Sequence, residues 1–243
     1  MSARMDLAAF PGVWRGGELD HAAVRGVPTG YPLLDRELPG GGWPRGALSE
    51  ILHDGVGMGE VSLLFGALKI VAGEGKAIAW VNPPHLPYAP ALAKAGVVLE
   101  ACLVVRPVTP EDALWSAEQA LRSGACGAVF FWLPERTDYA WLRRLQMAAE
   151  SRRALAVLFR PSSAASQPTP AHLRAVVSRA QDCLLVWLAK RRGPTLLQPV
   201  ALRIAGHPVM RMAASDAAPP GQACFTPFVP ASVIGRHALR ASA

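Results

Sequence analysis

The sequence of 243 residues has few aromatic side chains and no apolar run long enough to cross a bilayer. Aromatic residues make up 7% of the chain, although hydrophobic residues of all kinds make up 51%. A membrane-spanning helix needs about 20 consecutive apolar residues, and the first residues lack the pattern of a signal peptide. We therefore expect a cytoplasmic protein with no membrane contact, long enough for one large domain with a sizeable core.

Cysteine is also scarce, and its spacing is uninformative. The four cysteines, Cys102, Cys126, Cys183 and Cys224, lie far apart and form no paired motif. Metal-binding and redox-active cysteines usually come in close pairs. We therefore expect free thiols and no metal site, and we expect the lone His85 to pack in a turn between prolines.

Acidic residues are few in the second half of the chain. Residues 1–120 contain 9 Lys/Arg and 13 Asp/Glu, whereas residues 121–243 contain 16 Lys/Arg and 5 Asp/Glu. A basic excess of this size on one part of a protein attracts polyanions or an acidic partner. The alternative is a plain solvated surface rich in arginine.

Apolar segments of strand length alternate with segments of helical periodicity, which predicts an α/β fold with a doubly wound, mainly parallel sheet and flanking helices. We expect a flexible N-terminal arm over residues 1–27, a core over residues 28–206 and a flexible, proline-rich C-terminal tail over residues 207–243. The expected strands are residues 47–52, 77–81, 99–105, 128–133, 155–159, 183–189 and 200–204. The expected helices are residues 30–37, 61–72, 90–95, 110–123 and 138–153.

Residues 50–62, Glu-Ile-Leu-His-Asp-Gly-Val-Gly-Met-Gly-Glu-Val-Ser, have the pattern of a phosphate-binding loop between a strand and a helix. Gly55, Gly57 and Gly59 are suited to an anion-binding turn. However, Glu60 stands where such a loop needs lysine. Two like charges about 4 Å apart repel by roughly 4 kcal/mol at an effective dielectric constant near 20. The loop is therefore predicted to be degenerate and to bind no nucleotide cofactor.

Several strings resemble the core of RecA, the bacterial recombinase, in the same order along the chain. These are Thr29-Gly-Tyr-Pro-Leu-Leu-Asp35, Gly40-Gly-Gly-Trp-Pro-Arg-Gly46, Ser49-Glu-Ile-Leu52, Ala91-Leu-Ala-Lys-Ala-Gly-Val97 and the helix that ends Ala-Leu-Arg-Ser-Gly-Ala125. The resemblance implies a RecA-like core in which Pro84 replaces the acid that orients water and Trp132 replaces the magnesium ligand. With Glu60 these changes predict a protein that is not an enzyme. The alternative is a divergent DNA-dependent ATPase that uses Ser62.

The losses, together with the strings Phe10-Pro-Gly-Val-Trp-Arg-Gly16 and Phe225-Thr-Pro-Phe228, resemble the ImuA family of SulA-like, RecA-like proteins. This resemblance implies a non-catalytic accessory protein in SOS-induced translesion DNA synthesis and mutagenesis. The implied partners are an ImuB-type Y-family protein and its error-prone polymerase, with RecA and single-stranded DNA as further candidates. A third interpretation is a SulA-like inhibitor of cell division. The oligomeric state is left open.

Two sets of surface residues are predicted to bind partners. In RecA the loop that corresponds to Arg160–Ala171 contacts DNA, so the resemblance implies DNA contact here too. The predicted DNA-binding residues are Arg160, Arg174, Arg179, Lys190, Arg191 and Arg192. The predicted anchors for a protein partner are Trp14, in the arm, and Phe225 and Phe228, in the tail, because aromatic residues outside a core commonly dock into another protein.

Overall fold

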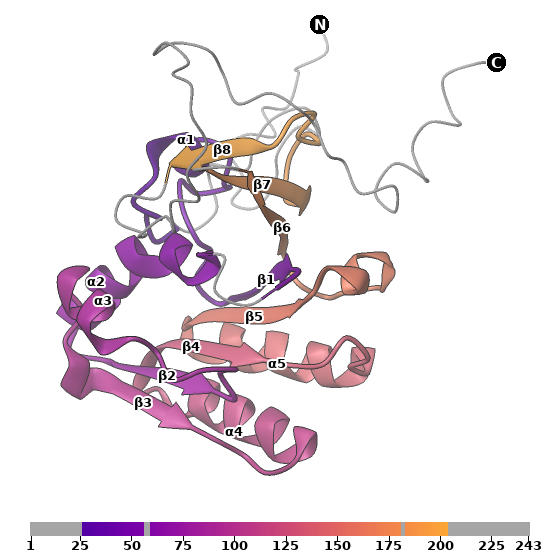
Figure 1. The fold of residues 1–243 in the computed structure, drawn as a ribbon. Coiled ribbons are helices and arrows are strands. Elements are labelled where there is room, and N and C mark those ends of the chain that lie inside the picture. Colours follow the sequence, from indigo (N-terminus) through magenta and orange to yellow (C-terminus); the bar gives the residue numbers. More distant parts are fainter. Residues whose placement is uncertain (1–25, 56–58, 181–182, 204–243) are drawn as a thin grey trace, which may run out of the picture.

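The computed structural model describes residues 26–55, 59–180 and 183–203 (Figure 1). The predicted tail and nearly all of the predicted arm lie outside these residues. Val27, which we predicted to end the arm, is 2% exposed and exchanges two backbone hydrogen bonds of 2.8 Å with Trp43. The core therefore includes at least residues 26 and 27.

One sheet of eight strands forms the centre of the molecule, in the order β3-β2-β4-β5-β1-β6-β7-β8. The strands are β1 (Ala47–His53), β2 (Ala77–Val81), β3 (Cys102–Val105), β4 (Cys126–Trp132), β5 (Leu155–Pro161), β6 (Leu173–Ala180), β7 (Cys183–Lys190) and β8 (Val200–Arg203). In this order, the strands from β3 through β2, β4, β5 and β1 to β6 are all parallel. Strand β7 is antiparallel to β6, and β8 is antiparallel to β7, so these two strands form an antiparallel edge. The predicted α/β class with a mainly parallel sheet is confirmed.

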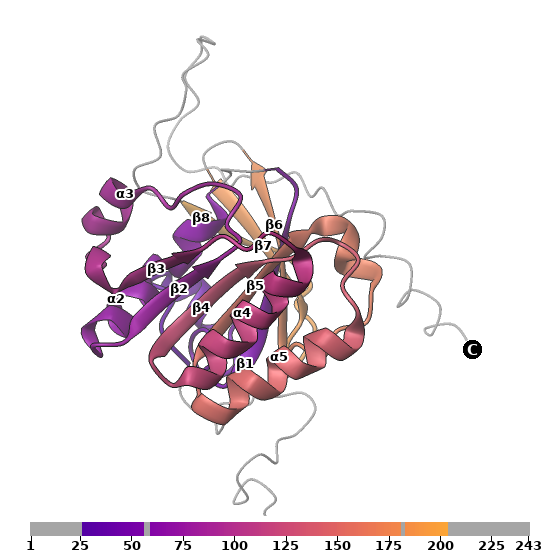
Figure 2. The same cartoon turned by 90° about the horizontal axis from the view of Figure 1, so that it is seen from below.

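Helices cover both faces of the sheet, as Figures 1 and 2 show. The helices are α1 (Pro32–Asp35), α2 (Phe65–Gly73), α3 (Ala89–Lys94), α4 (Pro110–Ser123) and α5 (Tyr139–Arg152), with 3-10 turns η2 (Glu60–Leu64), η3 (Leu99–Ala101) and η4 (Ser162–Ser166). On one face of the sheet, here called the α2 side, α2 packs in an apolar cluster that includes Trp80 and Phe130. On the other face, α4 and α5 pack in a second apolar cluster that includes Val129 and Phe131. Within the described ranges, no helix is long and apolar enough to cross a membrane.

Local sequence explains the clearest helix, α4. The hydroxyl of Thr109 accepts the backbone N–H of Asp112 at 3.1 Å, and Pro110 occupies the first turn, where it costs no hydrogen bond. Gly124 ends the helix with φ of 74°, a left-handed conformation that glycine adopts without strain. The predicted bounds of this helix are confirmed.

Sequence reasoning missed strand β6, which lies in the sheet between β1 and β7. From the sequence we expect no strand between residues 160 and 182 and predict that Arg174 and Arg179 bind DNA. In the structure, Leu173, Ala175 and Val177 face the α2 side, while Arg174 and Val176 face the other side. The arginine at a buried position disguised the period-two pattern of a strand.

Candidate functional site

The glycine loop follows β1 at the carboxyl edge of the sheet, where ligands bind in doubly wound folds. Gly55 and Gly59 have φ of 90° and 100°, as a tight turn requires, while Gly57 lies outside the described residues. The Glu60 carboxylate is 5% exposed, and its Oε2 accepts the backbone N–H of Gly59 at 3.1 Å. An acid at this helical N-terminus is favourable. The backbone N–H of Gly59 is thus bound to this carboxylate, whereas in a phosphate loop such an N–H faces a phosphate.

The other polar groups around this loop also bind within the chain. Ser62 is 4% exposed, and its hydroxyl donates to the Gly59 carbonyl at 2.5 Å. The Nδ1–H of His53 donates to the Gly55 carbonyl at 2.8 Å. The carboxylate of Asp54 accepts both the backbone N–H of Ser162, at 3.2 Å, and the Ser162 hydroxyl. The described residues on either side of positions 56–58 therefore bind within the chain, and Asp54 is joined to the turn after β5.

Aromatic rings fill the α2 side of the sheet next to the loop. The ring of Trp132 stacks on Phe159 with centroids 4.4 Å apart and an interplanar angle of 7°. On its other side it lies 6.2 Å from Trp80, again nearly parallel, at 16°. These residues are held in line because Trp132 pairs with Phe159 across neighbouring strands and Trp80 pairs with Phe130. The position expected for a magnesium-binding carboxylate is thus part of an apolar stack.

The neighbouring position after β2 offers no acid either. Asn82 has φ of 54°, and its amide donates to the Trp132 carbonyl at 3.2 Å. Pro84 and His85 follow it and are exposed. Among the described residues, no acceptor meets the buried indole N–H of Trp80 or Trp132. The described residues also contain no group of three His, Cys, Asp or Glu side chains that could hold a metal ion.

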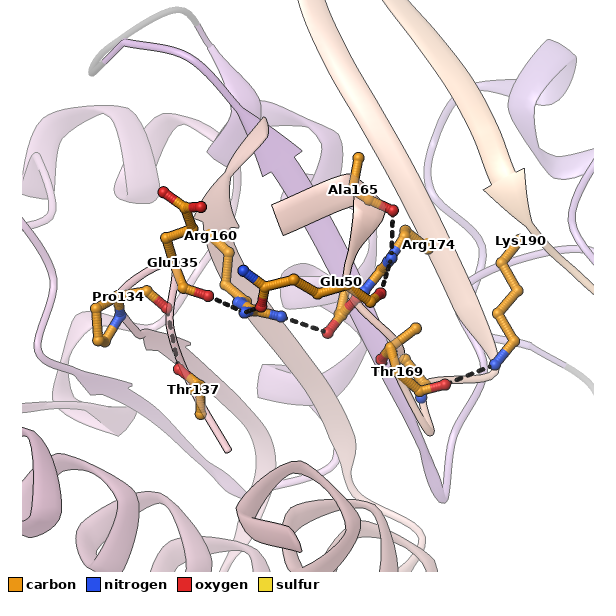
Figure 3. Close-up of polar contacts among 11 residues, drawn as sticks. Glu50, Pro134, Glu135, Thr137, Arg160, Ala165, Thr169, Arg174 and Lys190 are labelled. Atoms are coloured by element: carbon orange, nitrogen blue, oxygen red, sulfur yellow. Dashed lines mark hydrogen bonds and ion pairs between the residues drawn. The ribbon is translucent and has the colours of Figure 1, made fainter. Parts of the chain in front are cut away.

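A buried ion cluster lies on the other face of the sheet and consists of Glu50, Arg160 and Arg174, here called the Glu50 cluster (Figure 3). The three residues are 0%, 1% and 5% exposed. Arg174 Nε donates to one carboxylate oxygen at 2.6 Å, and Arg160 Nη1 approaches the other at 3.5 Å. The strand register creates this contact, because Arg174 is directly opposite Glu50 and Arg160 is opposite Leu52.

The two arginines hold the connection between β5 and β6 against the sheet. Arg174 Nη1 donates to the carbonyls of Ala165 and Gln167 at 2.9 and 2.8 Å. Arg160 Nη2 donates to the Gln167 side chain at 2.6 Å and to the carbonyl of Glu135. A crossover between parallel strands is usually an α-helix that satisfies its own backbone. Within this connection the structure has only η4, so side chains donate hydrogen bonds to its partly buried carbonyls.

The charges of the Glu50 cluster do not balance, because one carboxylate faces two guanidinium groups. Burial lowers the pKa of Arg160, an effect that Glu50 opposes and Arg174 reinforces. Within the described chain, Arg160 Nε and Arg174 Nη2 are buried without an acceptor. The positive charge is tolerated only with the carboxylate in place, since an unpaired buried charge is strongly unfavourable.

The predicted DNA-binding set therefore needs correction. Arg160 and Arg174 are enclosed in the Glu50 cluster and do not present their guanidinium groups to a phosphate. Arg191 is held as well, since its Nη1 donates to the carbonyl and carboxylate of Glu37 at 2.6 and 2.8 Å. The earlier interpretation failed because a basic side chain in a sequence gives no sign of a buried carboxylate opposite it.

The remaining cations of the set lie in two places. Lys190 is exposed and donates to the Thr169 carbonyl at 3.0 Å. Burial, Arg192 and Lys190 together lower the pKa of His172, so these three basic groups lie near one another. Arg179 is exposed five residues beyond Arg174 on β6, about 16 Å away at roughly 3.3 Å per residue. Trp14, Phe225 and Phe228 lie outside the described residues.

Sequence reasoning also missed Glu50 and Asp54, which tie the site together. A usable signal was present, because Glu50 is the single charged residue in the apolar strand Ala47–His53. A carboxylate in a strand buried on both faces requires a cationic partner. The partner could not be named from the sequence, since Arg160 and Arg174 are 110 and 124 residues away.

Comparisons with known proteins agree with this fold. Residues 46–156 match the family described as "Cell division inhibitor SulA". RecA 1 of Myxococcus xanthus is 34% identical over 110 residues, which cover 45% of this chain and 32% of that protein. RecA of Bacillus subtilis is 33% identical over 113 residues, which cover 46% and 32%. The matched part of the chain thus spans about a third of the length of these relatives.

A solved structure of SulA from Pseudomonas aeruginosa is also similar. It is 26% identical, and the match covers 47% of this chain and 97% of that one with a TM-score of 0.39.

Replacement of Glu50 by Gln should destabilise the fold strongly, because it leaves two buried guanidinium groups without a carboxylate. We expect a loss of about 3–5 kcal/mol in the free energy of unfolding, measured by urea denaturation. The control is Glu74→Gln, since Glu74 pairs with Arg45 near the surface and such pairs contribute about 1 kcal/mol or less. Equal stability of the two variants would show that the Glu50 cluster is not structural.

Proposed function

Because this chain is a RecA-like protein related to SulA, we propose that it is a non-catalytic accessory protein of SOS-induced translesion DNA synthesis in the cytoplasm. In this proposal it belongs with the ImuA type and serves as an adaptor for an ImuB-type protein and its error-prone polymerase. The observation that carries the non-catalytic part is the Glu60 carboxylate bound to the N–H of Gly59. The side chain of Glu60 thus provides the negative charge that the N–H of Gly59 binds.

The proposed lack of catalysis is supported by three positions considered together. Glu60 repels a phosphate, Pro84 supplies no base and Trp132 supplies no ligand for magnesium. Phosphoryl transfer depends almost entirely on positioning and on stabilisation of charge by such groups. The competing proposal, a divergent DNA-dependent ATPase, has to use Ser62, whose buried hydroxyl is directed to Gly59.

Partner binding is proposed to use the segments that flank the core. Trp14 lies before the core, and Phe225 and Phe228 lie after it, in a stretch with several prolines. Proline-rich sequence with a few apolar anchors suits docking to another protein. We propose the ImuB-type protein as the main partner and RecA as a further one.

A second candidate function is inhibition of cell division. The match of residues 46–156 to the SulA family favours it. In this case the partner would be the tubulin-like division protein, and the activity would not require an ImuB-type protein.

We propose contact with single-stranded DNA for Lys190, Arg192 and Arg179, which are not enclosed in the Glu50 cluster. Lys190 and Arg192 lie together near His172, and Arg179 lies further along β6. Arginine and lysine bind phosphate oxygens through charge-assisted hydrogen bonds. This set is smaller than the DNA-binding set that the sequence predicts, because Arg160 and Arg174 are enclosed in the Glu50 cluster.

Millimolar Mg-ATP should leave the melting temperature unchanged, because Glu60 and the aromatic stack exclude the phosphates. A ligand present at 100 times its Kd would stabilise the fold by about 2.7 kcal/mol. RecA, assayed in parallel, serves as the positive control. A clear thermal shift, or ATP turnover stimulated by DNA, would favour the ATPase instead.

Truncation after Gly206 should abolish capture of a purified ImuB-type protein and leave the melting temperature nearly unchanged. The double variant F225A/F228A is the milder version and should have the same effect. Insoluble truncated protein, with the double variant still binding, would place the docking site elsewhere. Filamentation of cells that overproduce the chain without an ImuB-type protein would favour the division inhibitor.

Binding of fluorescent single-stranded DNA should be independent of sequence and should weaken steeply between about 50 and 200 mM salt. The double charge reversal K190E/R192E is expected to reduce the affinity and the salt dependence, because it removes the paired cations. Fluorescence anisotropy measures both. If R179E alone has the larger effect, the contact surface is at the other end of β6.

A further inference from the structure

The outer face of α4 and α5 carries exposed side chains that neither the glycine loop nor the Glu50 cluster uses. Trp115 on α4 is 60% exposed, and Met147 on α5 is 56% exposed. Figure 2 shows these two helices side by side across one face of the sheet. Tryptophan is the residue type most enriched at the energetic centres of protein interfaces. The exposed Trp115 therefore indicates a surface that binds a partner protein.

Glu118 of α4 determines how the two helices face each other. Its carboxylate accepts Arg144 Nη2 at 2.5 Å and Arg122 Nε at 3.1 Å. Residues three apart lie on the same side of a helix, so Trp115 is one turn before Glu118 and Trp141 is one turn before Arg144. Both helices connect parallel strands and run in the same direction. The two tryptophans therefore lie at the same level, where the helices meet.

Of the two arginines on α5, Arg144 is held in place and Arg143 has no ion-pair partner within the described residues. The guanidinium of Arg144 lies over the Trp141 ring, 4.4 Å from its centroid, while it also binds Glu118. Arg143 is exposed and has no ion-pair partner among the described residues. Glu118 is already shared by two arginines, and Asp112 accepts the Thr109 hydroxyl at 2.8 Å. A cation held by a ring loses little entropy when it binds a carboxylate.

We infer that this surface, the α4–α5 face formed by Trp115, Trp141, Arg143, Arg144 and Met147, is a docking site for an acidic amphipathic helix of a partner protein. Apolar side chains of the partner cover the tryptophan and the methionine. Its carboxylates pair with the guanidinium of Arg143 and the outer N–H groups of Arg144. The α4–α5 face is on the opposite side of the sheet from α2 and the aromatic stack.

The charges of the chain itself favour a separate partner. Residues 204–243 contain three arginines and one aspartate, and residues 1–25 contain three arginines and three acids. Neither segment supplies the excess of carboxylates that the arginines require. A second copy docked through the same face would place the arginines of one copy against a face that also carries arginines, and like charges in a contact are unfavourable.

The test uses the full chain and a fluorescein-labelled 18-residue helical peptide of leucine, alanine and glutamate, with leucines at positions i, i+3, i+4 and i+7. A matched peptide carries lysine in place of glutamate. In anisotropy titrations at about 50 mM salt, where charge pairs are weakly screened, the glutamate peptide should bind at least about tenfold more tightly than the lysine peptide. Trp115→Ala and Arg143→Glu should each weaken it about tenfold or more.

Tyr88→Ala is the control, since Tyr88 is 72% exposed beside α3 and should not affect the peptide. Equal binding of both peptides, or unchanged binding to the Trp115 variant, overturns the inference. A loss of binding in the Tyr88 variant overturns it too, because the peptide would then coat apolar surface in general. A dimer that dissociates on Trp115→Ala in sedimentation would identify the surface as a self-interface instead. These outcomes do not depend on the proposed function, because neither nucleotide nor an ImuB-type protein is present.

Discussion

The ion pair between Glu50 and Arg174, with Arg160 beside it, is the interaction on which the second half of the fold depends. Strand β6 is parallel to β1, so the chain has to cross the sheet after β5 before β6 can begin. It makes this crossing without an α-helix, over the face on which Glu50 lies. The arginines bind the crossing segment, and Glu50 makes their burial possible. Strands β7 and β8 are then added to β6.

The Glu50 cluster and the glycine loop are connected through the same turn. Asp54, directly after β1, binds Ser162 at the start of η4, and Arg174 binds the carbonyl of Ala165 within η4. In a protein that responds to nucleotide, a ligand with different affinities for two arrangements would move such a turn. Here the turn is held by Asp54 and Arg174 of the chain itself, which favours one arrangement of the turn. The turn therefore links the end of β1 to the Glu50 cluster.

Much of the fold could be predicted from local sequence, and most of the site could not. The bounds of α4 follow from Thr109, Pro110 and Gly124, which act within one turn of the chain. Strand β6 was missed because Arg174 has a partner on a distant strand. The sequence predicts that Glu60 is out of place in a phosphate loop, but the bond of Glu60 to Gly59 depends on a backbone geometry that spacing alone does not define.

The aromatic stack stabilises the fold at the strand end where the RecA resemblance implies a magnesium ligand. A phosphate loop with its lysine and acids is a polar, strained site, and such sites commonly cost stability. Trp132 replaces an isolated charge with contacts to Phe159 and Trp80, and stacked rings contribute about 0.5–1.5 kcal/mol beyond their buried area. Under the proposed loss of nucleotide binding, a single lysine at position 60 would not create a site, because the indole of Trp132 would remain at the position that the RecA resemblance assigns to a magnesium ligand. Because aromatic rings line this part of the carboxyl edge, binding of partners is proposed for the outer surfaces and the flanking segments.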